Sequence, residues 1–280
     1  MKTAIYGAGQ AGRMCRMWLS KEHDVICYID SDPRKQGTFI DGIPVVGPDD
    51  MPRTDIVWVA VINREAVTEI KRMLTQKGCA KEIRDITGLR QDFDLRLCSL
   101  RLLALSVKER NIGGSLAELG VYQGAFAAEI SRLFPERKIV LFDTFAGFAE
   151  KDMEKEKEVS GQRRFRDFSD TGTEAVRQIM PYPENAVFVK GYFPDSVTGR
   201  DDLPDQYALV SLDPDLYAPA LSGLEYFWPR MAKGGVIMIH DYTSMQFPGV
   251  KKAVDEFCAQ NHLYPVPLMD LHGSAILTAQ

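Results

Sequence analysis

The sequence lacks the features that mark membrane-spanning, secreted or zinc-stabilised proteins. None of its apolar runs approaches the roughly 18 residues that a membrane-spanning helix needs. The first residues lead directly into a strand-like pattern, without the hydrophobic region of a signal peptide. The 5 cysteines are scattered and form no Cys-x-x-Cys pair, which predicts neither a disulfide framework nor a zinc site. We therefore expect a cytoplasmic protein with reduced thiols and no membrane partner.

Clustered positive charge is also absent. The formal net charge is −5 at pH 7 and no long run of Lys and Arg occurs. Sequence-independent binding of nucleic acid needs such a basic surface, so we expect no nucleic-acid partner. Apolar residues make up 45% of the chain, enough for a normal core. A length of 280 residues exceeds the usual size of one domain and favours two, and it leaves both a monomer and a homo-oligomer open.

Alternating strand and helix patterns predict two Rossmann-like α/β domains. The first covers residues 1–88 and forms a small parallel sheet. Residues 89–110 have apolar positions at helical spacing and are predicted to form a helical linker. The strand pattern then restarts, which predicts a longer doubly wound sheet over 111–280. Within it the highly charged stretch 151–166 predicts an exposed helix or a mobile lid.

A glycine-rich turn lies near the start of the chain. Gly7, Gly9 and Gly12 follow a strand and open a helix, and Asp30 ends the next strand. This pattern suits a pyrophosphate at the helix start and a ribose hydroxyl on the acid. The alternative is a Rossmann-like unit that keeps the turn but binds no dinucleotide. Residues 1–88 also resemble the small N-terminal domains of bacterial sugar O-acyltransferases, which implies contact with nucleotides or nucleotide-sugars, or a role in assembly, rather than redox chemistry.

A second glycine loop, ELGVYQG, occupies residues 118–124, and FDTF follows at the next strand end, 142–145. In an open parallel sheet such a loop marks the point where a ligand lies across the strand ends. The alternative is an ordinary strand-to-helix turn with surface acids. The pattern resembles the cofactor site of class I methyltransferases, which implies S-adenosylmethionine as cofactor. By that resemblance six residues contact it: Glu118 at the amino-acid end, Gly120, Tyr122, Gly124, Asp143 at the ribose hydroxyls, and Thr144.

Acidic residues also end two later strands, in LDPDLY over 212–217 and HDY over 240–242. Asp213, Asp215 and Asp241 thus fall at the same edge of the predicted sheet, where their carboxylates can converge on one hard cation. A metal at a sugar diol would lower the pKa of the hydroxyl and orient it. The alternative is that these acids only cap helices.

Six ordered stretches resemble the macrocin O-methyltransferase (TylF) family: ELGVYQG, FDTFAGF, GYFPDS, LDPDLY, HDY and GVKKAVDEF, which ends at 257. The resemblance implies transfer of a methyl group from S-adenosylmethionine to a hydroxyl of a sugar or nucleotide-linked sugar. It also implies Asp213 and Asp241 as magnesium ligands and Asp215 as the base. Residues 165–171 resemble the family's substrate-side loop.

One departure concerns His240, which stands where the family has the first acid of an Asp-Asp pair. Imidazole is a poorer ligand than carboxylate for Mg²⁺, so we expect Mn²⁺ or Fe²⁺, weak binding, or no metal. His240 is alternatively a general base, or a histidine held only for packing. Two other functions stay open: a non-catalytic protein that binds nucleotide-sugars or serves assembly, and an NAD(P)-dependent sugar oxidoreductase that uses the first glycine turn.

Overall fold

The computed structural model describes residues 1–88, 94–161, 166 and 168–280, and the chain forms two compact units, Met1–Asp94 and Leu95–Gln280. The boundary differs from the predicted helical linker over 89–110. Helix α4 (Leu95–Glu109) belongs to the second unit, where Leu100, Ala104 and Val107 are buried in its core. Residues 89–93 lie outside the described residues. Among the described residues, no helix has the length and apolar character needed to cross a membrane.

The first unit is a 6-stranded sheet in the order β3-β4-β2-β1-β5-β6. Its central strand β1 pairs in parallel with β2 on one side and with β5 on the other. The order of the strands therefore reverses at β1, and the first glycine turn follows this strand. Helix α2 begins after Asn63, whose side chain accepts a hydrogen bond from the Ala66 amide, and ends at Gly78 in the left-handed conformation. The elements of this unit are β1 (Lys2–Tyr6), α1 (Gln10–Trp18), β2 (Asp24–Ile29), β3 (Phe39–Ile40), β4 (Ile43–Val46), β5 (Thr54–Val59), α2 (Arg64–Lys77) and β6 (Ala80–Asp85).

The second unit is a 7-stranded sheet in the order β12-β13-β11-β10-β7-β8-β9. All neighbouring pairs from β11 to β9 are parallel, and β13 runs antiparallel to β11 and β12. The strands are β7 (Ser115–Leu119), β8 (Ile139–Asp143), β9 (Ala186–Lys190), β10 (Tyr207–Leu212), β11 (Met231–Ile239), β12 (Val266–Pro267) and β13 (Ala275–Thr278). The described part thus has the predicted doubly wound sheet, and the antiparallel pair of β12 and β13 completes it at one edge.

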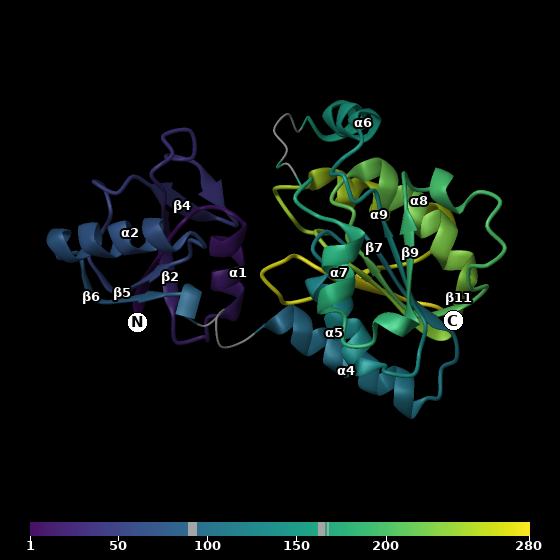
Figure 1. The fold of residues 1–280 in the computed structure, drawn as a ribbon. Helices are drawn as coiled ribbons and strands as arrows, with labels where there is room; N and C mark the ends of the chain where they lie inside the picture. Colours follow the sequence, from purple (N-terminus) through teal and green to yellow (C-terminus); the bar gives the residue numbers. More distant parts are fainter. Residues whose placement is uncertain (89–93, 162–165, 167) are drawn as a thin grey trace. The chain divides into compact units, whose positions relative to one another are not determined.

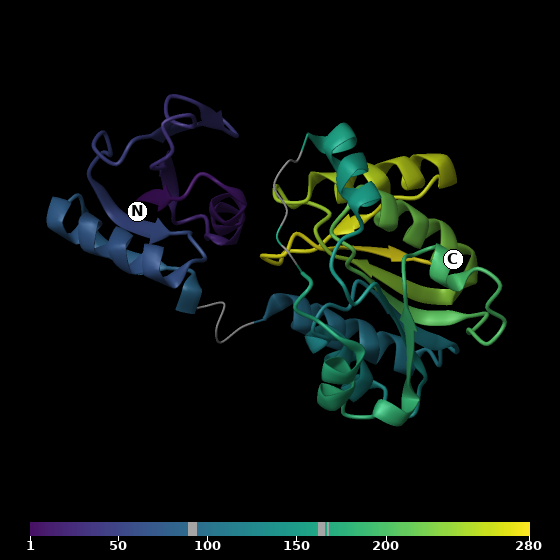
Figure 2. The same cartoon turned by 45° about the horizontal axis from the view of Figure 1, so that its top comes forward.

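Helices cover both faces of this sheet (Figures 1 and 2). One face packs against α4, α5 (Ala125–Leu133) and α7 (Thr173–Ile179), and the other against α8 (Tyr217–Phe227) and α9 (Pro248–Asn261). Helix α6 (Glu150–Ser160) packs on α8 and α9. Short 3₁₀ helices occupy Pro183–Asn185, Asp195–Val197 and Trp228–Arg230. Because both faces are covered, the central strands are almost wholly apolar; all six residues of β10 are buried.

The order of the strands in this sheet reverses between β7 and β10. The loops that follow these two strands contact each other at this point. Gly120, directly after β7, has φ +86°, and a Cβ at this position would lie 2.0 Å from the carbonyl oxygen of Asp213. Only glycine permits this approach. The close approach brings the glycine loop and the acidic turn after β10 to one edge of the sheet.

Helix α6 exposes most of its charged side chains, as predicted, but one of its faces is buried. Two of its acids, Asp152 and Glu156, are buried. The Glu156 carboxylate accepts hydrogen bonds from the amides of Tyr217, at 2.8 Å, and Gly249, at 3.0 Å, in the first turns of α8 and α9. One carboxylate therefore caps two helices and fastens α6 to them. The rest of the predicted exposed stretch, 162–165, lies outside the described residues.

Candidate functional site

The first glycine turn is compact and internally bonded. A Cβ at Gly12 would lie 1.9 Å from the Gly7 carbonyl oxygen, so Gly12 lets α1 pack onto the turn, and Gly9 is the residue that precedes α1. Asp30 accepts hydrogen bonds from the Ala8 amide and from Lys35 Nζ, both at 2.8 Å. Burial alone would raise the pKa of Asp30, but these bonds lower it. The four predicted residues lie together, and binding of a nucleotide to them stays a prediction.

The second glycine loop is organised by Asp143 at the end of β8. Its Oδ2 accepts hydrogen bonds from the amides of Val121, at 2.7 Å, and Tyr122, at 2.9 Å, and its Oδ1 accepts from the Phe145 amide at 2.7 Å. These bonds hold Tyr122 in the left-handed region at φ +50°. Asp143 therefore shapes the loop after the neighbouring strand, and its contact with a cofactor ribose stays a prediction.

The other loop residues of the prediction also lie at this edge. A Cβ at Gly124 would be 2.5 Å from Val176 Cγ1, so the loop packs tightly on α7. Thr144 donates a hydrogen bond to the Gly147 carbonyl at 2.6 Å. The Tyr122 hydroxyl lies 2.8 Å from both carboxylate oxygens of Asp170. Asp170 belongs to the predicted substrate-side loop 165–171, of which 165 and 167 lie outside the described residues.

Glu118 lies beneath the loop rather than on its surface. Its side chain is buried, and Oε1 accepts a hydrogen bond from Ser211 Oγ at 3.0 Å. Burial, aided by the nearby Asp213 carboxylate and opposed by Arg96, raises the pKa of Glu118 to about 8. The carboxyl is therefore mostly protonated at neutral pH. Because Glu118 is buried, it is not one of the surface acids of the alternative interpretation. Its direct contact with the cofactor's amino-acid end stays a prediction.

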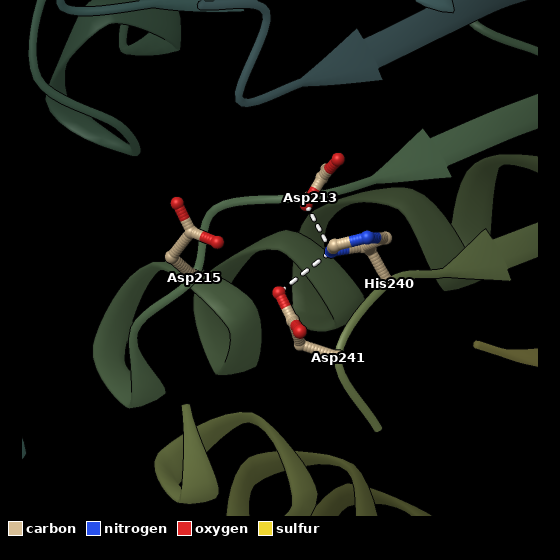
Figure 3. Close-up of side chains that lie close together, drawn as sticks. All are labelled: Asp213, Asp215, His240 and Asp241. Atoms are coloured by element: carbon tan, nitrogen blue, oxygen red, sulfur yellow. Dashed lines mark hydrogen bonds and ion pairs between the residues drawn. The ribbon is translucent and has the colours of Figure 1, made fainter. Parts of the chain in front are cut away.

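The acids that end β10 and β11 converge as predicted. One ligand atom from each of Asp213, Asp215, His240 and Asp241 lies within 4.8 Å of the others, as Figure 3 shows. His240 Nδ1 is 2.8 Å from Asp213 Oδ1 and 2.6 Å from Asp241 Oδ2. Asp215 and Asp241 have positive φ angles, 62° and 58°, so tight turns direct both side chains to this cluster. The cluster thus consists of one imidazole and three carboxylates.

Charges within this cluster are strongly coupled. Burial opposes protonation of His240, but Asp213 and Asp241 outweigh it and raise the pKa of His240 to about 10. Burial also disfavours the ionised form of Asp213, yet His240 and Arg96 hold its pKa well below the usual range. The pKa of Asp215 is raised by burial and by the carboxylates of Asp213 and Asp241. In the absence of a metal, the protonated imidazole therefore acts as the local cation.

Two residues of this site have no counterpart in the sequence predictions. Arg96, in α4, places Nη2 2.9 Å from Asp213 Oδ2 and its guanidinium 3.8 Å from the centre of the Phe126 ring. His272, between β12 and β13, places Nδ1 3.2 Å from His240 Nε2. Neither belongs to a motif. The chain contains only 4 histidines, and this small number is the one feature of the sequence that could have drawn attention to His272.

Residues 87–277 match the model of the family described as Macrocin-O-methyltransferase (TylF). Residues 1–83 match the family model described as C2185-like, N-terminal. A demethyldecarbamoylnovobiocin O-methyltransferase of Streptomyces niveus is 27% identical over 180 residues, which are 59% of this chain and 66% of that protein. A second relative, from Streptomyces olivaceus, is 25% identical over 159 residues, 52% of this chain and 60% of that protein: 8-demethyl-8-(2,3-dimethoxy-alpha-L-rhamnosyl)-tetracenomycin-C 4'-O-methyltransferase. The chain thus spans less than two thirds of the length of these two curated relatives.

Two solved structures share the fold of the second unit. The O-methyltransferase NovP aligns with a TM-score of 0.56 at 24% identity, over 66% of this chain and 79% of its own. The calicheamicin methyltransferase CalS11 aligns with a TM-score of 0.53 at 23% identity, over 65% of this chain and 78% of its own. Both alignments support the assignment of the second unit as a doubly wound methyltransferase fold.

Proposed function

The chain belongs to the macrocin O-methyltransferase (TylF) family, and on that premise we propose that it transfers a methyl group from S-adenosylmethionine to a hydroxyl of a sugar or nucleotide-linked sugar. One observation supports this proposal above all: the second glycine loop lies at the same edge of the sheet as a cluster of four side chains. These four are Asp213, Asp215, His240 and Asp241. The names of the relatives support the class of acceptor, since one contains a rhamnosyl group and both end in O-methyltransferase.

The residues proposed to hold S-adenosylmethionine are Gly120, Tyr122, Gly124, Asp143 and Thr144, with Glu118 beneath them. Their fit rests on the start of α5, where Gly124 precedes the helix and no described side chain caps it. Helix amides of this kind favour an anionic group such as the cofactor carboxylate. The cofactor supplies a methyl group on a sulfonium, which is a good leaving group. The loop's task is to hold this group in line with the acceptor hydroxyl.

Asp213, His240 and Asp241, with Asp215 beside them, are the residues proposed to hold a divalent metal. One imidazole nitrogen among carboxylate oxygens suits Mn²⁺ or Fe²⁺ better than Mg²⁺. A metal bound there would lower the pKa of an acceptor hydroxyl that coordinates it. Asp215 is the group proposed to receive the proton, because its carboxylate lies beside the three proposed ligands.

A metal-free mechanism with His240 as general base is the second candidate. Its support is the position of Nδ1, which lies between Asp213 and Asp241. Against it stands the pKa of about 10, since an imidazole that is already protonated at neutral pH accepts no further proton. We therefore prefer the metal-assisted mechanism, in which the metal would displace the proton from Nδ1 of His240.

For the first unit we propose binding of a nucleotide or nucleotide-sugar, or a role in assembly, without hydride transfer. Asp30, the acid that would contact a ribose, already bonds Lys35 and the Ala8 amide. This bonding gives the acid a structural task that needs no dinucleotide. Substrate-dependent turnover of NAD(P)H would favour the oxidoreductase instead.

The proposed function is tested by calorimetry with S-adenosylmethionine, followed by methyl-transfer assays across nucleotide-linked sugars. We expect saturable cofactor binding and transfer to at least one sugar hydroxyl. Absence of cofactor binding by the wild-type protein would exclude the methyltransferase. Cofactor binding without transfer to any sugar would favour the non-catalytic alternative.

A further inference from the structure

We propose that His272 is a positioning residue for the metal site: it fixes the orientation and tautomer of His240 so that Nδ1 of His240 faces the carboxylates. The inference deepens the proposed function and rests on the divalent metal in it. His272 lies 32 positions beyond His240 in the sequence, in the turn between β12 and β13, and it is not a member of the four-residue cluster itself.

The two ring nitrogens of His240 face different groups. Nδ1 lies 2.8 Å from Asp213 Oδ1 and 2.6 Å from Asp241 Oδ2, whereas Nε2 lies 3.2 Å from His272 Nδ1. The rings of the two histidines are 5.3 Å apart between centres and tilted by 48°. The cluster therefore uses one edge of the imidazole and His272 contacts the other.

This arrangement determines where the proton of a neutral His240 belongs. For Nδ1 to offer its lone pair to a metal, the ring proton must lie on Nε2, where it needs an acceptor. His272 Nδ1 is at hydrogen-bond distance for that role. A neutral imidazole as acceptor also adds no negative charge to a site that already contains three carboxylates.

His272 is itself held in place from two sides. The buried Asp270 carboxylate accepts hydrogen bonds from the amides of His272, at 3.1 Å, and Ser274, at 3.0 Å. The Gly273 carbonyl accepts a hydrogen bond from the Thr243 amide at 2.9 Å, two residues after Asp241. The turn is thus fixed both internally and to the segment that carries the ligands. A ring on such a turn can orient His240 with little freedom.

The test measures Mn²⁺ affinity of the full chain by electron paramagnetic resonance of free Mn²⁺, without any assay of methyl transfer. His272→Phe keeps a flat ring and removes the acceptor. His272→Asn keeps an oxygen close to the position of Nδ1. We expect His272→Phe to weaken Mn²⁺ binding by about 10- to 100-fold, the usual loss for a residue behind a metal ligand, and His272→Asn to stay near wild type.

Each outcome separates the inference from the proposed function. If the wild-type protein binds Mn²⁺ and His272→Phe binds it equally well, the inference is wrong and the metal proposal stands. If wild type binds no Mn²⁺, the metal proposal fails and the inference fails with it. Unchanged affinity for S-adenosylmethionine, measured by calorimetry, shows that each variant is folded and tests the cofactor proposal separately.

A second measurement avoids variants altogether, in case His272→Phe does not fold. The wild-type protein is labelled with ¹⁵N-histidine and loaded with diamagnetic Zn²⁺. Nuclear magnetic resonance should then show a His240 whose Nε2 carries the proton and whose Nδ1 is bound to metal. A His240 with its proton on Nδ1 would overturn the inference.

Discussion

Arg96 and Asp213 form an ion pair across 117 positions of sequence, with Nη2 2.9 Å from Oδ2 and only 11% and 19% of their side chains exposed. The pair ties helix α4 to the end of β10 and supplies a second cation to Asp213, beside His240. A segment expected to be a linker thus contributes directly to the charge balance of the candidate site.

Replacing Arg96 with methionine should destabilise the protein. It leaves Asp213 with one cationic neighbour, and removing one partner from a mostly buried pair costs about 3 kcal/mol or more in free energy of unfolding. Arg96→Lys should lie in between, because lysine keeps the charge but loses the stacking on Phe126. Urea denaturation at pH 7 measures both.

The control for Arg96 lies on the same helix. Arg101 is 59% exposed and its contact with Glu129 is loose, at 3.9 Å. Arg101→Met should therefore change the free energy of unfolding by less than about 1 kcal/mol. Equal effects of the two methionine variants would contradict the proposed importance of the Arg96 pair.

Glu156→Gln should destabilise the second unit more than Glu158→Gln. The Glu156 carboxylate accepts the amides of Tyr217 and Gly249, and a glutamine can offer only one oxygen to these two donors. Loss of one charge-assisted bond to a buried amide costs about 1–3 kcal/mol. Glu158 is 70% exposed and pairs only with Lys155 among the described residues, which makes it a matched control on α6. Chemical denaturation that showed no difference would count against the capping role.

The sequence predicted the parts of the site that follow from local patterns. Glycines after a strand predict a turn at the sheet edge, and the acids Asp213 and Asp241 directly follow strands. Because parallel strands end at the same edge, these separate patterns were expected to meet, and the cluster in Figure 3 agrees with that expectation. The doubly wound fold was predictable for the same reason.

The rest depends on tertiary contacts that no local pattern contains. The many charged residues around Glu156 predict a solvent-exposed helix. Nothing nearby in the sequence indicates that the Glu156 carboxylate accepts hydrogen bonds from the amides of Tyr217 and Gly249. Arg96 and His272 reach the site from segments about 117 and 32 positions away from their partners. The resemblance places Gly120 beside the cofactor, and the structure shows a further reason for glycine, since a Cβ there would meet the Asp213 carbonyl oxygen.

Asp143→Ala should weaken binding of S-adenosylmethionine by at least tenfold. The variant removes the acceptor for the amides of Val121 and Tyr122, so the glycine loop loses the bonds that shape it. Asp143→Asn keeps one oxygen and should lose less. Isothermal calorimetry compares the variants with Asp205→Asn, an exposed control. Wild-type affinity in Asp143→Ala would exclude both the loop-shaping and the ribose-binding role.

In metal-free protein, His240 should stabilise the fold in a pH-dependent way. Its pKa in the folded state is about 10, raised from an ordinary value of 6.5 by Asp213 and Asp241 against the effect of burial. Because the folded pKa is the higher one, the stabilisation is fully present below about pH 6.5 and is lost as pH rises towards 10. The measurement is the difference in free energy of unfolding between wild type and His240→Gln, in chelator, from pH 5.5 to 9.5. A difference that does not fall with pH would contradict the raised pKa.

The identity of the metal is the final prediction, and it depends on the nitrogen that His240 places among oxygens. Chelator should abolish methyl transfer, and Mn²⁺ should restore it at least as well as Mg²⁺. His240→Asp should move the preference back towards Mg²⁺, because a fourth carboxylate replaces the softer imidazole.

Asp213→Asn separates the metal from the cofactor. The variant should lose transfer while its affinity for S-adenosylmethionine stays unchanged, since Asp213 is proposed to serve the acceptor through the metal and its partners are His240 and Arg96. Steady-state transfer assays under each metal, with calorimetry for the cofactor, measure both quantities. Full activity of the wild type in chelator, combined with an inactive His240→Ala, would instead identify His240 as a metal-free base, because transfer would then need the imidazole but no metal.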